Sequence, residues 1–239
     1  MQIGDECDTH RVKPIMPRCV RSEGGSGWPE RLEAARMWTL YDFLESGNGY
    51  KVRLTLRELG RPFIYREVDI LRGESREPWF LEKSLVGQIP VLELDDGTCL
   101  SESTAILFHI AEGSPLLPVG QLSRTRVLQW MCFEQTHVDG VISRARFRRL
   151  HPEAIPTRPE EFEAWWAQGT QALSVLSERL SRHDYLVDDQ FSLADIALYA
   201  YVHRAGEGGL DLAAFPALRA WFARIQARPA YLPIDQTPA

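Results

Sequence analysis

Four small or polar residues, Ser46-Gly47-Asn48-Gly49, stand between a short apolar segment and a stretch with helical periodicity. If these flanks are a strand and a helix, the turn lies at the carboxyl end of a strand, where open α/β sheets place their ligands. The Ser46 hydroxyl or the Asn48 amide could donate a hydrogen bond there to an anion such as a thiolate, which lowers the thiol pKa. The same residues also suit a β-turn that caps the helix, so both interpretations stay open.

A second candidate ligand site is Ser101-Glu102-Ser103, at the start of a predicted helix over residues 101–111. Unpaired N–H groups and the helix dipole favour an anion at such an end, so Ser103 could hold a carboxylate. Glu102 could accept a hydrogen bond from an ammonium group, and the pair would then fit the head of an α-amino acid. The alternative is an N-cap with an acidic first turn.

The dipeptide Ile89-Pro90 lies in a segment, residues 87–94, that leads into a predicted strand. Proline cannot donate a ladder hydrogen bond, so it suits the start of a strand. If the peptide bond is cis, the chain turns sharply and leaves the backbone N–H and C=O of Ile89 free to pair with an extended peptide, as a sheet edge does. The alternative is a trans proline, which is by far the commoner state.

These three motifs fall in a region where strand and helix patterns alternate. Apolar or alternating segments predict strands over 37–43, 62–68, 87–94 and 98–100. Helical spacing of apolar residues predicts helices over 50–59 and 101–111, with a short helix or turn over 77–85. The order β-α-β-α-β-β-α predicts an α/β domain with a mixed sheet, whose first βαβ unit is parallel.

The second half of the chain reads as a separate all-helical domain. Beyond a proline- and glycine-rich linker at 113–120, helical patterning covers 121–150, 159–182, 192–205 and 215–227. Ser192 and Asp195 form a predicted capping box, flanked by Phe191 and Ile196 as a hydrophobic staple. We therefore assign Asp195 to folding rather than to chemistry.

Composition narrows the function classes. The 239 residues are 44% hydrophobic and 25% charged with a formal net charge of −6, as in an ordinary soluble globular protein. The acidic balance argues against a nucleic-acid binder. No apolar run approaches the ~18 residues of a membrane helix, and the N-terminus lacks the apolar segment of a secretory signal. Residues 1–36 have no sustained periodicity, so we expect a disordered N-terminal extension.

The four cysteines are scattered, with no CxxC pair, and neither His137 nor His151 stands at metal-ligand spacing from a cysteine. A chain of this length does not need disulfides to stabilise its core. We therefore expect reduced thiols in a cytoplasm and no metal. The cysteines are Cys7, Cys19, Cys99 and Cys132.

In combination, the motifs resemble one family. A β-α-β-α-β-β-α domain with Ile-Pro before its third strand and Glu-Ser at its last helix is similar to the thioredoxin-like domain of cytosolic glutathione S-transferases, and the helical half with its Ser-x-x-Asp box is similar to their second domain. The bacterial members with serine or asparagine at the thiol site are the most similar type. The resemblance covers residues 37 to 232 and implies a thioredoxin-like glutathione-binding domain over 37–115 and an all-α domain over 121–232.

The resemblance implies how the tripeptide binds. Ile89 matches the position whose backbone pairs with the cysteinyl part of glutathione, and Gln88 matches a side-chain contact. Glu102 and Ser103 match the pair that grips the γ-glutamyl head. For the glycine carboxylate there are two candidate partners, Lys83 and Arg146.

The resemblance also places the reactive sulfur on the ligand. Ser46 matches the serine that stabilises the thiolate in serine-type members, and Asn48 matches an asparagine that serves the thiol in nu-like members. Gly49 stands where beta-like members carry a cysteine, so no enzyme thiol is available there for a mixed disulfide. Tyr41 falls one position away from the tyrosine of tyrosine-type members.

The expected function is that of a glutathione transferase, which activates the thiol of glutathione for attack on a small electrophile in detoxification. Glutathione would be a co-substrate, and the family precedent implies a homodimer with no nucleic-acid or membrane partner. Two alternatives stay open. One is a glutathione-dependent disulfide reductase on the same fold, which Asn48-Gly49 favours. The other is a non-catalytic interaction module that kept the fold.

Overall fold

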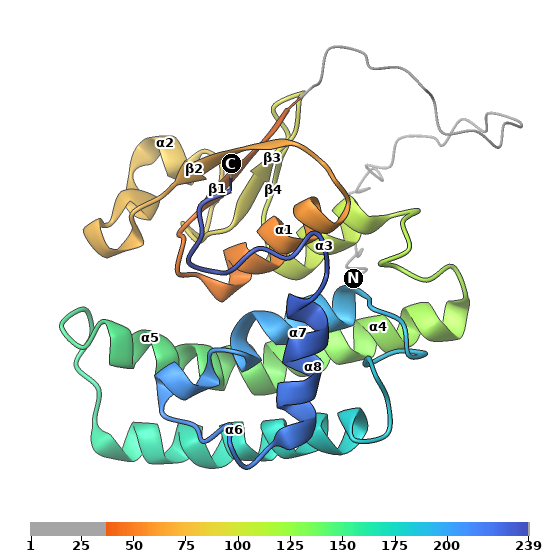
Figure 1. The fold of residues 1–239 in the computed structure, drawn as a ribbon. Coiled ribbons are helices and arrows are strands. Elements are labelled where there is room, and N and C mark those ends of the chain that lie inside the picture. The colour runs from red at the N-terminus through yellow and green to blue at the C-terminus, as the bar shows by residue number, and fades with distance from the viewer. Residues whose placement is uncertain (1–36, 239) are drawn as a thin grey trace, which may run out of the picture. The chain divides into compact units, whose positions relative to one another are not determined.

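The computed structural model describes residues 37–238 (Figure 1). The predicted extension over residues 1–36 lies outside the described residues, together with Cys7 and Cys19. Cys99 and Cys132 are both free thiols. No helix within residues 37–238 is long and apolar enough to cross a membrane.

A four-stranded mixed sheet with the order β2-β1-β3-β4 forms the first half. β1 (Trp38–Asp42) pairs parallel with β2 (Phe63–Glu67) and antiparallel with β3 (Val91–Glu93), which pairs antiparallel with β4 (Cys99–Leu100). The parallel pair follows from the helix that connects β1 to β2, because parallel strands need such a crossover. The predicted α/β fold with a mixed sheet is confirmed.

Three helices accompany the sheet: α1 (Gly47–Glu58), the short α2 (Pro78–Leu81) and α3 (Ser103–Ala111). In Figure 1, α1 and α3 lie between the sheet and the helical half. Both helices bury apolar side chains, including Val52, Leu56 and Ile106, which are fully buried. Two single-turn segments, η1 (Ile70–Arg72) and η2 (Glu74–Arg76), follow β2.

The helical half contains α4 (Gln121–Phe133), α5 (Arg144–Leu150), α6 (Pro159–Leu180), α7 (Leu193–Val202) and α8 (Pro216–Gln226), with a short turn η4 (Ala205–Gly208). The helix predicted over 121–150 is continuous, but its middle is a π-helical segment of ten residues, η3 (Glu134–Ser143). Such segments widen the turn and are frequent at functional sites. Every residue of α7 is buried, so this helix is the centre of the second core.

Asp195 anchors the start of α7 and is fully buried. It accepts hydrogen bonds from the Ser192 amide at 3.0 Å, the Ser192 hydroxyl at 3.1 Å, the Leu186 amide at 3.1 Å and Trp221 Nε1 at 3.0 Å. Burial raises the pKa of Asp195 to about 6, although these donors favour the charged form. The predicted capping box is present, and all of these contacts are structural.

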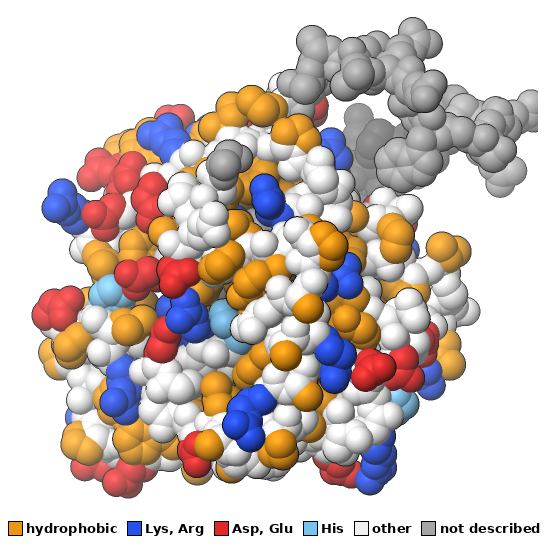
Figure 2. Space-filling model, viewed as in Figure 1, with side chains coloured by type: hydrophobic (Ala, Val, Ile, Leu, Met, Phe, Trp, Pro, Cys, Tyr) orange, Lys and Arg blue, Asp and Glu red, His pale blue; other side chains and the backbone are white. Residues whose placement is uncertain are grey.

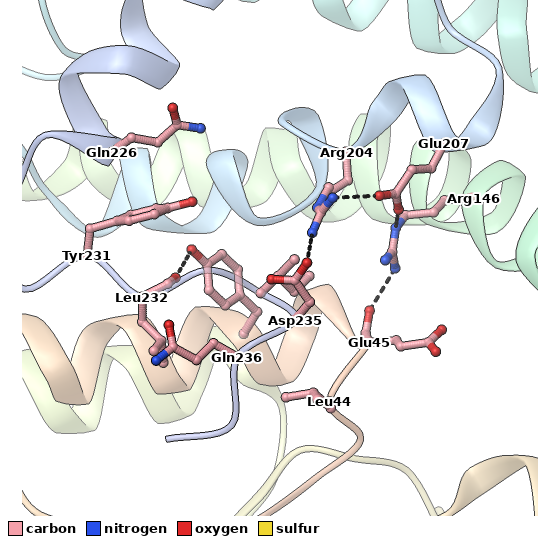
Figure 3. A network of polar contacts seen from close by, with 12 residues as sticks. Leu44, Glu45, Arg146, Arg204, Glu207, Gln226, Tyr231, Leu232, Asp235 and Gln236 are labelled. Atoms are coloured by element: carbon pink, nitrogen blue, oxygen red, sulfur yellow. Dashed lines mark hydrogen bonds and ion pairs between the residues drawn. The ribbon is translucent and has the colours of Figure 1, made fainter. Parts of the chain in front are cut away.

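The segment after α8 packs back onto α1. Tyr50 Oη donates to the carbonyl of Leu232 at 2.6 Å, and the Arg53 guanidinium donates to the carbonyl of Ile234 at 2.9 Å. Arg204, just after α7, pairs with Asp235 at 3.0 Å (Figure 3). These contacts tie the two halves together along one side of the molecule.

The surface carries both signs of charge. On the face seen in Figure 2, Lys and Arg side chains are interspersed with Asp and Glu over both halves. No broad basic area stands out among the described residues on this face. Within residues 37–238, no group of His, Cys, Asp and Glu is placed to hold a metal ion.

Candidate active site

A cavity of about 540 Å³ lies where the first half meets η3. The turn before α1, the segment before β3 and the start of α3 supply one wall, and η3 supplies the other. Motifs that are far apart in the sequence therefore converge on one space. All six predicted site residues line it: Ser46, Asn48, Gln88, Ile89, Glu102 and Ser103.

The Ser46 turn caps a helix and faces the cavity at once. Ser46 Oγ accepts a hydrogen bond from the Gly49 amide at 3.3 Å, which makes Ser46 the N-cap of α1. The helix therefore begins at Gly47, whereas the sequence pattern predicted a start at Tyr50. Within residues 37–238, the Ser46 hydroxyl proton has no acceptor. Both interpretations of this turn are thus compatible with each other.

The carboxamide of Asn48 connects two of the motifs. Its Oδ1 accepts hydrogen bonds from Lys51 Nζ at 2.7 Å and from Ser103 Oγ at 3.1 Å. Its Nδ2 donates to Asp139 Oδ2 at 3.4 Å. The start of α1, the start of α3 and η3 therefore meet at this one side chain.

The segment before β3 presents unpaired backbone groups. The Ile89-Pro90 peptide bond is cis, and Ile89 lines the cavity. In the described part of the chain, the N–H and C=O of Ile89 have no hydrogen-bond partner. The residue before it is fixed, because Ser84 Oγ donates to the Gln88 carbonyl at 3.1 Å and accepts from the Gln88 amide at 3.2 Å. An extended peptide could pair with Ile89 as with a sheet edge.

At the third motif, the sequence pattern predicted a helix start at Ser101, whereas α3 begins at Ser103. Glu102 precedes it with φ of 68°, a left-handed conformation that non-glycine residues rarely adopt. Such outliers cluster at ligand sites, where the surroundings hold them in place. Glu102 is exposed and Ser103 is buried at the cavity wall. An exposed carboxylate thus stands beside the amide groups that open α3.

Four further polar residues line the cavity and were not predicted: Ser75, Arg76, Gln135 and Asp139. Arg76 donates to the Val86 carbonyl at 2.8 Å and is the cation of this lining. Gln135 and Asp139 lie on η3, one helical turn apart. The sequence showed only that residues 121–150 are amphipathic, which does not tell a face that meets a cavity from one that meets solvent.

Lys83, one of the two candidates for a carboxylate contact, lies elsewhere. Its Nζ pairs with Glu93 Oε2 at 2.8 Å, and it is not part of the cavity wall. Tyr41 Oη donates to the same carboxylate at 2.6 Å. Burial and the negative charge of Glu93 raise the pKa of Tyr41, so this phenol is kept protonated. Lys83 therefore lies outside the cavity lining, and Tyr41 belongs to the same separate cluster.

Arg146 lines a smaller cavity of about 160 Å³ that also has Ser46 in its wall. Its Nε pairs with Glu207 at 2.6 Å, and a terminal nitrogen donates to the carbonyl of Glu45 at 2.7 Å (Figure 3). Arg146 thus fixes the backbone directly before Ser46. The rest of that wall is mainly apolar: Phe43, Ile70, Phe147 and Tyr201, with Gly47 and Ser143.

Gly49, in the first turn of α1, has no room for a side chain. A Cβ atom on Gly49 would lie 1.5 Å from Asp42 Oδ1. Asp42 is itself fixed, fully buried with Arg53 Nε at 3.0 Å from Oδ2. Glycine at this position is therefore a requirement of the packing beneath the turn.

Family models match both halves of the chain. The model described as glutathione S-transferase, N-terminal domain, covers residues 40–116, and that described as glutathione S-transferase, C-terminal domain, covers residues 145–229. The chain belongs to the glutathione S-transferase family. The resemblance and the enzyme class expected from the sequence are confirmed at this level.

Individual relatives within the glutathione S-transferase family span most of the chain. The disulfide-bond oxidoreductase YfcG of Escherichia coli K12 is 32% identical over 79% of this chain and 90% of that protein. Glutathione S-transferase GstA of Escherichia coli O157:H7 is 30% identical over 74% of this chain and 87% of its own length. A crystal structure of a glutathione S-transferase from Pseudomonas fluorescens Pf-5 is 46% identical with a TM-score of 0.80, covering 83% of this chain and 98% of that one.

Proposed function

We propose that this transferase binds glutathione in an extended form along the cavity wall. The observation that carries the proposal is the convergence of all six motif residues on one cavity, with the N–H and C=O of Ile89 unpaired there. These two groups would pair with the cysteinyl backbone, and the Gln88 side chain would contact the tripeptide. Glu102 and the start of α3 at Ser103 would hold the ammonium and carboxylate of the γ-glutamyl head.

The thiol would then lie near Ser46 and Asn48. The Ser46 hydroxyl proton and an Asn48 N–H are the donors that this part of the wall offers to a sulfur. Hydrogen bonds to the thiolate stabilise the charged form and lower the thiol pKa. The thiolate sulfur would bond to the electrophilic carbon of a co-substrate, and the leaving group would depart with its bonding electron pair. The smaller cavity beside Ser46 would receive the co-substrate.

A second reaction on the same site is glutathione-dependent disulfide reduction. The similarity to the disulfide-bond oxidoreductase YfcG favours it. The glutathione thiolate would attack a disulfide sulfur, form a mixed disulfide and release one thiolate. A second glutathione thiolate would attack the glutathionyl sulfur, which releases the other thiol and yields oxidised glutathione. No enzyme cysteine takes part, in keeping with glycine at position 49.

The setting of the enzyme is part of the proposal. We propose a homodimer that works in detoxification in the cytoplasm. The free thiols of Cys99 and Cys132 are compatible with a reducing compartment. A role in detoxification rests on the family alone.

Calorimetry with reduced glutathione tests the binding step on the whole chain. We expect heat of binding at millimolar glutathione or below, and no detectable heat would overturn the proposal. Rates with an aryl halide and with a small disulfide, each with glutathione in excess, then separate the two reactions. A transferase reacts faster with the halide, and a reductase with the disulfide.

A further inference from the structure

A buried ion pair beneath the cavity has no role in the chemistry proposed above. Lys51 Nζ lies 2.8 Å from Glu134 Oε2, and both side chains are fully buried. Lys51 belongs to α1 and Glu134 opens η3, so the pair joins the two halves. The desolvation of two buried charges often outweighs their attraction, so such a pair is weak evidence for stability. It is better explained by what it orients.

What Lys51 orients is the side chain of Asn48. Lys51 Nζ donates to Asn48 Oδ1 at 2.7 Å. An ammonium group has donors only, so the carboxamide atom that faces it must be the oxygen. Ser103 Oγ donates to the same oxygen at 3.1 Å. Nδ2 is thereby turned to the opposite side, where it reaches Asp139 on the cavity wall at 3.4 Å.

This orientation leaves a donor for a ligand. An amide nitrogen carries two N–H groups, and Asp139 takes one of them through a long contact. The other has no acceptor within residues 37–238. The remaining neighbours are consistent with the arrangement. Tyr201 Oη accepts from the Asn48 backbone amide at 3.1 Å, and Lys51 opposes the rise that burial gives to the pKa of Glu134.

We infer that Lys51, held by Glu134, is a positioning residue that makes Asn48 present Nδ2 rather than Oδ1 to the glutathione sulfur. The inference rests on the proposed function and deepens it. With Lys51 in place, a thiolate meets an N–H donor. Without it, only Ser103 and the long Asp139 contact hold the amide, and rotation by half a turn would set an oxygen against the thiolate.

The test replaces both charges together. In the double variant Lys51→Met, Glu134→Gln the net charge is unchanged and no buried charge is left alone. We expect the pKa of the bound glutathione thiol, followed by thiolate absorbance, to rise by about one unit, which lowers the thiolate fraction by about tenfold at pH values below that pKa. kcat at neutral pH should fall in proportion and recover at alkaline pH, whereas KM for glutathione stays within about twofold. Adding Asn48→Ala should change little more, because the two act as one unit.

A matched control removes an ion pair that lies away from the cavity. Arg228 and Glu58 pair at 2.8 Å, and Glu58 is at the other end of α1. Glu58→Gln, Arg228→Met should lower the midpoint of thermal unfolding and leave the thiol pKa unchanged. A thiol pKa that also stays unchanged in the folded Lys51 double variant overturns the inference. The proposed function is tested by a different result: it is overturned if the unmodified chain does not bind glutathione.

If the double variant does not fold, two single variants give the same test. Lys51→Arg keeps a donor-only cation, whereas Lys51→Gln can accept from the amide as well as donate to it. Only Lys51→Gln should raise the thiol pKa. Equal thiol pKa values in the two variants would overturn the inference.

Discussion

Ser46 serves both the helix and the cavity, so its replacement should have two separable effects. In Ser46→Ala the Gly49 amide loses its acceptor, which lowers the free energy of unfolding by about 1 kcal/mol. Under the proposed function the glutathione sulfur also loses a donor, so the pKa of the bound thiol should rise and turnover at neutral pH should fall several-fold. Thermal unfolding reports the first effect and the pH–rate profile the second. An unchanged profile would assign the thiol contact to Asn48 alone.

Gly49 is the residue at which packing is most restrictive. Gly49→Ala places a Cβ at 1.5 Å from a carboxylate oxygen that is itself buried and paired. We expect a loss of at least about 3 kcal/mol in the free energy of unfolding, as for severe overpacking. Gly140→Ala is the matched control on η3, because nothing lies within 4 Å of its added Cβ. Equal midpoints of chemical denaturation for the two variants would contradict this account.

Among single residues, the sequence identified the site candidates that belong to a recognisable local motif. Ser46 and Ser103 could be identified because each stands near the start of a predicted helix. Ile89 could be identified because a proline comes directly after it. Asp139 could not be identified, because a carboxylate on an amphipathic helix has the same local sequence whether it faces water or a cavity. Lys83 pairs with Glu93 at the end of β3, outside the cavity lining, and the strand pattern gave no indication of this pairing.

Among the elements, α7 supplies a pH-dependent feature at its C-terminal end. His203 stacks on Tyr199 with ring centroids 4.2 Å apart, and its Nδ1 contacts the Tyr199 carbonyl at 2.5 Å. Burial lowers the pKa of His203 to about 3, and the nearby Arg204 and Arg146 add to this. Between pH 6.5 and 3 the unfolded chain therefore binds the extra proton, so stability is lost as pH falls below 6.5.

The expected loss from His203 is about 2 kcal/mol between pH 6.5 and 5. Chemical denaturation at the two pH values measures it. His203→Gln should remove this part of the pH dependence, whereas His109→Gln, at an exposed position on α3, should retain it. A slope that persists unchanged in His203→Gln would show that another group is responsible.

Element type was predictable from periodicity, and element ends were less so. α1 starts at Gly47 because Ser46 is its N-cap. The predicted start was later, at residue 50, because residues 46–49 have the composition of a turn. The π-helical character of η3 has no sequence pattern of its own, since its apolar residues continue the spacing of α4. This matters for the site, because η3 carries both Gln135 and Asp139.

At the scale of the whole molecule, the segment after α8 acts as a tie between the halves. It accepts hydrogen bonds from Tyr50 and Arg53 of α1, and Asp235 pairs with Arg204. Truncation after Tyr231 should leave the fully buried Arg53 without two of its acceptors, the carbonyls of Ile234 and Gln236, and lower the free energy of unfolding by about 3 kcal/mol or more. Truncation after Gln236 is the control and should have little effect. Equal midpoints of thermal unfolding in the two would contradict the prediction.

The make-up of each half was predictable from the order of elements, but this tie was not. The strand and helix order led directly to the mixed sheet and the helical second half. Ile234 and Asp235 carry no periodic signal, and their partners, Arg53 and Arg204, are arginines far away in the sequence. The domain limits of 37–115 and 121–232 stay predictions.

The contact between Gly49 and Asp42 constrains how this chain could evolve. A change of Gly49 to cysteine, the step toward chemistry with an enzyme thiol, is blocked while the Asp42 carboxylate occupies the space of its Cβ. Asp42 in turn cannot shrink alone, because Arg53 would keep a buried charge without its partner. At least three positions would have to change in a suitable order, and the first steps would lower stability. The packing beneath the turn therefore disfavours a cysteine at position 49, in keeping with the proposed chemistry on the thiol of glutathione.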